Sequence, residues 1–288
     1  MNIKDFIDLH VHIGPEPIPR KFTLEKLVSE ENGKLNGVGL KNHFYPTTPF
    51  IKSSDIATDL KLIGSVVLNN YVGGLNPDVV YSTAKISDNP TIVWFPTINA
   101  ENFLKKSEYE IRPEWTDGKF KSRLSKDIKG IKILDNSGKL TEAALSVLNA
   151  IKDNNCILAT GHISSTETQV LVPSALELGV CKIIITHPIY QLIEMPIDKQ
   201  IEISKAKGVY IEVPYSMYAI DKIAAEDLVK SIKSVGSNKS IISSDVGQIN
   251  MPYPSEALEE FARLLKVNGI DEEAIEQMGK INPRKLIT

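Results

Sequence analysis

Short apolar runs recur from one end of the chain to the other, and each is followed by turn residues or by a stretch with helical spacing. The first run holds Phe6, Ile7, Leu9 and Val11. Continuous apolar runs of this length are typical of strands that are buried on both faces of a sheet. We predict eight strands, over residues 6–12, 38–43, 62–68, 91–96, 156–162, 182–187, 209–214 and 240–245.

The segments between the predicted strands contain helix signals. Thr23 and Thr141 are placed as N-caps, and Asn76 precedes Pro77 in the usual order of cap and first helical residue. A short helix is predicted over residues 54–60, and longer ones near 195–207, 224–235, 255–268 and 271–279.

Two segments depart from this alternation. Residues 98–128 are polar and carry no pattern, which is typical of a lid or an active-site loop. Residues 130–140 contain an apolar run followed by the turn sequence Asp-Asn-Ser-Gly, and we predict a small hairpin outside the main sheet.

Eight strands separated by helices or long loops favour an α/β fold with a parallel sheet. In a chain of 288 residues this number suggests one (β/α)8 TIM barrel domain over residues 1–288. A doubly wound open sheet is the alternative. Both architectures place their ligands at the carboxyl ends of the strands, so candidate functional residues are sought there.

The composition is that of an ordinary soluble protein, with 42% hydrophobic residues, 24% charged residues and a net charge of −3. This balance gives no electrostatic signature of nucleic-acid binding, and no apolar run reaches the roughly 18 residues of a membrane span. The first residues lack the features of a secretion signal. Cys156 and Cys181 are expected to be small buried hydrophobic residues, and a cytoplasmic location fits best.

Histidines end the predicted strands. His10 and His12 lie one pleat apart and should face the same side of the first strand, where two imidazoles can bind one metal ion. His43 ends the second strand, His162 the fifth and His187 the sixth. The eighth strand ends at Asp245. In a barrel these side chains form a ring around one opening, and such a donor set suits zinc, iron, manganese or nickel.

This ordered set of motifs resembles the amidohydrolase superfamily of metal-dependent hydrolases, and the resemblance extends to the closing run Ile-Asn-Pro-Arg-Lys-Leu at residues 281–286. The resemblance implies a barrel with one or two divalent ions and an activated water. It implies that His10 and His12 hold the more buried ion and that His162 and His187 bind a second ion or complete a mononuclear site. Asp245 would be a metal ligand and the catalytic proton shuttle.

One position departs from the superfamily pattern. Members with two metals usually carry a bridging carboxylated lysine or a glutamate at the end of the fourth strand, where this chain reads Trp94-Phe95-Pro96-Thr97. Lys41, at the end of the second strand, is one candidate for the bridge. A plain ammonium at Lys41 would instead suit an anionic group of the substrate. Lys132 is the other candidate, provided that residues 131–134 form the true fourth strand.

Further polar residues are candidates for weaker roles. Asp8 has the same strand parity as the two histidines and is a candidate acceptor that orients one of them. His43 is assigned to substrate binding or to support of the ligands. The loop residues Arg20, Arg112 and Trp115 are candidates for contacts with substrate. Glu212 lies inside the seventh strand, and its role is left open.

The function expected from these features is metal-dependent hydrolysis of an amide, lactone or ester bond in a small molecule, with zinc as the favoured ion. One alternative is a mononuclear zinc-dependent decarboxylase of the same superfamily. A second alternative is a non-catalytic barrel that binds a metabolite. A nucleic-acid or membrane partner is not expected, and assembly into a homo-oligomer is left open.

Overall fold

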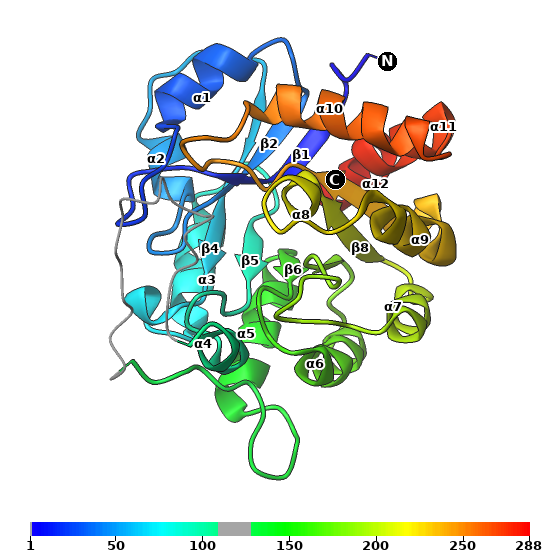
Figure 1. The fold of residues 1–288 in the computed structure, drawn as a ribbon. Coiled ribbons are helices and arrows are strands. Elements are labelled where there is room, and N and C mark those ends of the chain that lie inside the picture. The colour runs from blue at the N-terminus through cyan, green and yellow to red at the C-terminus, as the bar shows by residue number, and fades with distance from the viewer. Residues whose placement is uncertain (1, 109–127) are drawn as a thin grey trace.

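The computed structural model describes residues 2–108 and 128–288, and its strands are parallel. One sheet has the order β1-β2-β3 and the other has the order β4-β5-β6-β7-β8-β9. In Figure 1 the strands surround the middle of the molecule, and α1, α6, α7, α9 and α10 lie around them. The strands are β1 (Ile7–His12), β2 (Gly37–Lys41), β3 (Lys61–Ile63), β4 (Ser65–Val67), β5 (Ile92–Trp94), β6 (Ile157–Ala159), β7 (Ile183–Ile185), β8 (Val209–Pro214) and β9 (Ser240–Ser243).

The two sheets are one barrel. β3 and β4 are the two halves of the predicted third strand and are separated only by Gly64. On the other side, the Asp245 N–H donates to the His10 carbonyl and the His12 N–H donates to the Val246 carbonyl, both at 2.8 Å. These bonds join the first strand to the segment that follows the last one. The fold is therefore the predicted (β/α)8 barrel, and the open doubly wound sheet is excluded.

Two apolar layers follow from the alternation of side chains along each strand. The inner cluster includes Ile92, Trp94 and Ile157, while neighbours of opposite parity such as Val93 and Leu158 pack outward against the helices. Leu286 and Ile287 of the last helix also belong to the inner cluster. Apolar side chains therefore fill the barrel interior. The polar group of His10, His12 and Asp245 lies above them, at the carboxyl ends of the strands.

The helices follow the predicted signals in most places. The Thr23 side chain accepts from the Lys26 N–H and the Thr141 side chain from the Ala144 N–H, so both N-caps are confirmed. The Asn76 side chain caps the helix that begins at Pro77. The α-helices are α1 (Leu24–Glu31), α2 (Thr48–Lys52), α3 (Pro77–Lys85), α4 (Glu101–Lys106), α5 (Glu142–Asp153), α6 (Ser165–Glu177), α7 (Ile197–Ser204), α8 (Tyr215–Ala219), α9 (Ala225–Val235), α10 (Pro254–Val267), α11 (Glu272–Glu276) and α12 (Asn282–Ile287). The 3-10 helices are η1 (Asn70–Val72) and η3 (Ser237–Lys239), and η4 (Gln277–Ile281) is a π-helix.

Two predictions about local structure are wrong. No helix forms over residues 54–60, because Pro49 starts α2 earlier and the hydroxyl of Ser54 bonds the Ile51 carbonyl at the end of that helix. Cys156 is buried as expected, but Cys181 is exposed, since β7 begins two residues after it and leaves it in the preceding loop. The hairpin predicted over residues 130–140 lies outside the main sheet, as expected, and its two arms pair through an isolated antiparallel bridge between Leu134 and Leu140.

Gly161 brings the end of β6 against the neighbouring strand. Its φ is +63°, and a Cβ added there would lie 2.2 Å from the Phe95 carbonyl oxygen. The His162 N–H, next along the chain, donates to the Pro96 carbonyl at 3.0 Å. This close approach of two backbones holds His162 at the mouth of the barrel, and only glycine permits it.

We expect Gly161→Ala to lower the free energy of unfolding by roughly 2–4 kcal/mol, because it adds a clash to an unfavourable φ. Gly138→Ala is the matched control, since Gly138 also has a positive φ, of +79°, but no atom lies within 4 Å of its added Cβ. That control should cost only about 1 kcal/mol. Urea unfolding of both variants measures the difference, and equal losses would contradict the close-packing argument.

Candidate metal centre

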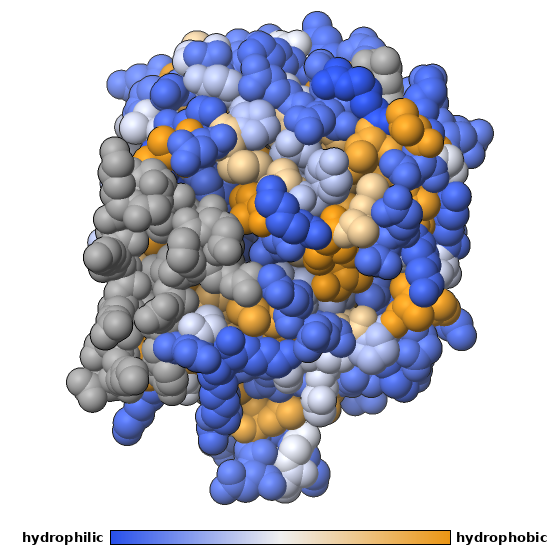
Figure 2. Space-filling view, in the orientation of Figure 1, coloured by the Kyte–Doolittle hydropathy of each residue, from blue (hydrophilic) through white to orange (hydrophobic). Residues whose placement is uncertain are grey.

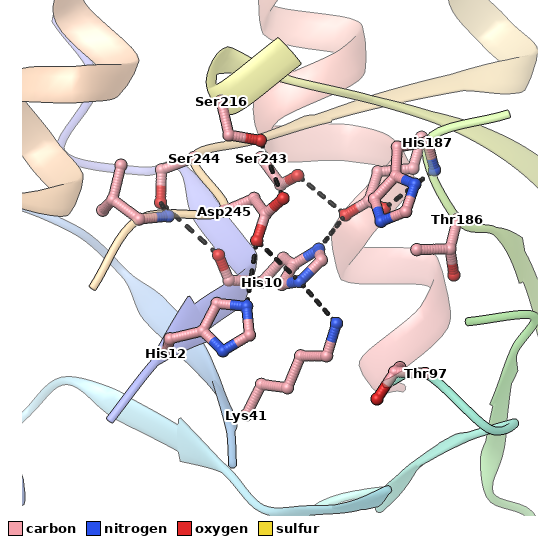
Figure 3. Close-up of polar contacts among 12 residues, drawn as sticks. His10, His12, Lys41, Thr97, Thr186, His187, Ser216, Ser243, Ser244 and Asp245 are labelled. Atoms are coloured by element: carbon pink, nitrogen blue, oxygen red, sulfur yellow. Dashed lines mark hydrogen bonds and ion pairs between the residues drawn. The ribbon is translucent and has the colours of Figure 1, made fainter. Parts of the chain in front are cut away.

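His10 lies between two carboxylates at the end of β1. Its Nδ1 contacts Glu212 Oε1 at 2.8 Å, and its Nε2 lies 3.0 Å from Asp245 Oδ1. The ring is fully buried. Since the carboxylate of Glu212 can only accept, Nδ1 carries a proton towards it, and Nε2 is left directed at Asp245 (Figure 3). A histidine whose second nitrogen donates to a carboxylate is the usual arrangement of a metal ligand.

His12 and Asp245 complete the group. His12 Nε2 lies 3.0 Å from Asp245 Oδ1, and the Ser216 hydroxyl donates to Asp245 Oδ2 at 2.7 Å. One ligand atom from each of His10, His12 and Asp245 lies within 4.8 Å of the others, and all three residues are buried. The residues described, 2–108 and 128–288, contain no other group of three or more histidine, cysteine or acidic residues with this spacing.

Charge and burial act against each other in this group. Burial alone would raise the pKa of Asp245, but His10 and His12 outweigh it and hold that pKa well below its usual value. Burial would lower the pKa of His10, but Asp245 and Glu212 outweigh it and raise that pKa. The surroundings of His10 therefore favour a positive charge on its ring, which either a second proton or a bound cation can supply.

The other three histidines lie around the same cavity, as predicted. The rings of His162 and His187 have centroids 5.2 Å apart, and the ring of His43 lies 4.8 Å from that of His12. The cavity is lined by His12, His43, His162, His187 and Asp245, together with Lys41 and Arg20. His162 and His187 are not part of the close donor group, so the structure brings them to the opening without placing them in one ligand set with His10.

Lys41 points into the barrel mouth. Its Nζ lies 2.9 Å from His10 Nε2 and 4.1 Å from the centre of the Trp94 ring, and the residue is 1% exposed. Burial lowers the pKa of the Lys41 amine to about 8, so an appreciable fraction is uncharged near neutral pH.

Lys132, the other bridge candidate, lies in a different environment. Its side chain is 58% exposed and pairs with Glu101 at 3.3 Å, and β5 (Ile92–Trp94) is the true fourth strand, so Lys132 is wrong as a bridge candidate.

Asp8 does not orient a histidine ring, which corrects the expectation from strand parity. The pairing of β1 with β2 shifts register between Asp8 and Val11, and a bulge of this kind changes which side chains face the barrel. Asp8 Oδ1 instead accepts from the backbone N–H groups of His10 and Ser244, at 3.1 and 3.0 Å. It therefore fastens the first strand to the segment after β9.

Glu212 is the carboxylate that sequence reasoning left unassigned. It is 1% exposed and accepts from His10 Nδ1, from the Ser243 hydroxyl at 2.8 Å and from the His187 N–H at 3.2 Å. The signal was present in the sequence, because an acidic residue inside the apolar strand Val-Tyr-Ile-Glu-Val-Pro has to be buried and therefore paired.

Residues from two loops were also named as candidates. Arg20 lines the cavity and its Nε donates to Glu16 Oε1 at 2.5 Å. Arg112 and Trp115 lie outside the described residues. Figure 2 shows apolar side chains near the centre of this face of the molecule, interspersed with hydrophilic ones.

The donor set fits a divalent transition-metal ion. Two imidazoles and a carboxylate are ligands of this class, and Glu212 supports one of them from behind. His12 Nδ1 and His187 Nδ1 are buried without a hydrogen-bond partner in the described part of the chain. Buried polar atoms of this kind usually have a partner, so bound groups in the cavity would satisfy them.

No helix of the described segments is long and apolar enough to cross a bilayer.

Solved structures share the fold. An amidohydrolase from Pseudomonas aeruginosa is 8% identical with a TM-score of 0.63, and the match covers 98% of this chain and 95% of that one. The probable dipeptidase PvdM from the same organism is 12% identical with a TM-score of 0.60, over 98% and 94% of the two chains. A 2,6-dihydroxybenzoate decarboxylase is 11% identical with a TM-score of 0.52, over 99% of both chains. At these identities the matches establish the barrel fold that the chain shares with these proteins and nothing finer.

Sequence comparison gives a family. The model of a family of unknown function, DUF6282, matches residues 5–212, which include β1 to β8 as far as Glu212. A search of curated proteins gave no match.

Proposed function

The chain belongs to the DUF6282 family, and we propose that it is a cytoplasmic, metal-dependent hydrolase that acts on an amide, lactone or ester bond of a small molecule. The observation that carries this proposal is the buried group of His10, His12 and Asp245 at the carboxyl ends of the barrel strands. Active sites of such barrels are built at this end. The whole chain would form the one catalytic domain.

The residues of the mouth divide into two proposed binding positions. His10, His12 and Asp245 would hold the first ion, most simply zinc. His162 and His187 would hold a second ion, and Lys41 would bridge the two if its amine is carboxylated. A lowered amine pKa supports this reaction, because only the uncharged amine combines with carbon dioxide. When bound, a divalent ion supplies acidification of water and polarisation of the scissile carbonyl.

Asp245 would receive the proton of the attacking water. Its Oδ1 faces the two histidines, whereas Oδ2 contacts the Ser216 hydroxyl, so Oδ2 is the atom at which we place the proton. A hydroxyl donates to a carboxylate and accepts from a carboxylic acid, so Ser216 can stay bonded in both states. The same carboxyl group would then deliver the proton to the leaving group.

His43 is proposed to face the substrate. Its Nδ1 bonds the Thr97 hydroxyl at 2.9 Å, and Asn69 contacts both Thr97 and the His43 carbonyl. This network, which connects the ends of three strands, fixes the ring at the cavity wall. The probable dipeptidase among the solved structures with this fold is, by its name, an enzyme for amide bonds, which supports an amide among the bond types to test.

The test is the metal content of protein purified without chelator, measured by plasma mass spectrometry. We expect about two equivalents of zinc or a similar ion per chain, none or one in His10→Ala, and none or one in Lys41→Ala. Lys132→Ala is the matched control for the lysine, since its exposed side chain lies away from the cavity, and it should leave the content unchanged.

Other results would redirect the proposal. One equivalent that is indifferent to Lys41→Ala would remove the bridge and favour a mononuclear site. Release of carbon dioxide from a panel of carboxylic acids, without turnover of amides, lactones or esters, would then select a decarboxylase. An absence of metal even after reconstitution with zinc or manganese would overturn the proposal and leave a non-catalytic binding barrel.

A further inference from the structure

Arg20 enters the cavity from the loop that follows β1. Its side chain is only 2% exposed, and its Nε donates to Glu16 Oε1 at 2.5 Å. The second oxygen of Glu16 accepts from the His43 N–H at 2.8 Å. Glu16 therefore connects the guanidinium to the end of β2, where Lys41 and His43 also lie.

The loop that carries Arg20 is fastened at several points. The Gly14 N–H donates to the Phe22 carbonyl at 2.9 Å, and the Lys21 N–H donates to the Gly247 carbonyl at 2.8 Å. The first bond closes the loop on itself and the second holds it to the segment after Asp245. Arg20 is thus held in position before any ligand binds, and it would lose little conformational freedom on binding.

The two terminal nitrogens of Arg20 are the unexplained feature. Its one hydrogen bond and ion pair to the described residues use Nε, which leaves Nη1 and Nη2 without a partner there. Arg20 lines the same cavity as His12, Lys41 and Asp245. A guanidinium that is buried to this degree normally has its donors satisfied, so the Nη pair marks a place for an acceptor.

We propose that the Nη1–Nη2 edge of Arg20 binds a carboxylate of the substrate, so that the hydrolase acts on an amide, lactone or ester that also carries an acid group. The statement that the bound acid is a substrate rests on the proposed hydrolase function. The binding of a carboxylate at Arg20 does not depend on that function. The planar pair of donors matches the two oxygens of a carboxylate. A phosphate dianion would bring a second negative charge towards Asp245 and Asp221, which line the cavity as well.

The experiment compares acids with neutral molecules of similar shape. Zinc-loaded protein is titrated calorimetrically with acetate, propanoate and benzoate, and then with acetamide, propanamide, benzamide and methyl phosphate. We expect the best acid to bind about tenfold or more weakly to Arg20→Gln, with amide binding unchanged. Arg263→Gln, which changes an arginine whose side chain is 72% exposed, is the matched control and should bind like the natural protein.

A titration of metal-depleted protein separates the arginine from the ions. Without metal, the natural protein should still bind the acid more tightly than Arg20→Gln does. A carboxylate that was bound only through zinc would instead lose its affinity for the natural protein and for the variant alike. If Arg20→Gln does not fold, Arg20→Lys keeps the charge and removes the Nη pair, and it should show the same loss. Equal binding of acids to the natural protein and to these variants, no binding of any acid, or preference for methyl phosphate would overturn the assignment. Binding that depends on Arg20 without any hydrolysis would contradict the proposed reaction and leave the subsite standing.

Discussion

Asp245→Asn is expected to reduce kcat/KM by about a thousandfold or more for any amide, lactone or ester that the protein hydrolyses. An amide group cannot accept a proton as a carboxylate does, and it cannot balance a positive charge on His10, whose pKa the carboxylate of Asp245 raises. The contacts of Oδ1 with both rings and of Oδ2 with Ser216 show how much of the cluster converges on this one side chain. The measurement is steady-state hydrolysis across a lactone and amide panel.

Controls separate chemistry from folding and from metal loss. Ser216→Ala removes only the hydroxyl on Oδ2, and we expect a loss of about tenfold, because the hydrogen bond orients the carboxylate without carrying the proton. Far-ultraviolet circular dichroism and metal analysis of both variants show whether fold and ions remain. A folded Asp245→Asn protein that keeps its metal and at least a tenth of the natural rate would contradict the proton-transfer role.

The fold was largely predictable because strand signals in a barrel are local. Every predicted strand is present, and the third is interrupted only at Gly64, where a Cβ would lie 2.1 Å from the Thr48 hydroxyl. The ring of histidines also followed from the sequence, since barrel topology alone brings strand ends together. What could be predicted was therefore the position of each residue along its strand.

Contacts across the barrel were not predictable in the same way. Strand parity placed Asp8 with His10, but a bulge between Asp8 and Val11 breaks that parity, and no local sequence signal revealed it. Glu212 lies 202 residues from His10 in the chain and yet bonds its ring. Which carboxylate meets which imidazole depends on register and rotamer, so sequence reasoning could name the acidic residue but not its partner.

The second large effect is expected at Glu212. We predict that Glu212→Gln weakens zinc binding by about 10- to 100-fold, as is typical when the carboxylate behind a metal-binding histidine is removed. The glutamine amide can turn its NH2 group towards Nδ1, which would force His10 into the tautomer that has its proton on Nε2. The nitrogen that faces Asp245 would then no longer be a ligand. Competition with a coloured chelator measures the zinc affinity.

Glu31→Gln is the matched control for burial. Glu31 is 0% exposed and its carboxylate accepts from the Ser255 N–H and hydroxyl, but it lies on α1 and does not line the cavity. Both variants should unfold at a lower temperature, because each leaves buried donors with a poorer acceptor. Only Glu212→Gln should lose zinc affinity. If the two variants lost stability alike and bound zinc as tightly as the natural protein, Glu212 would be a structural carboxylate, and the orientation of His10 would have to come from the packing of its ring 4.5 Å from that of Trp94.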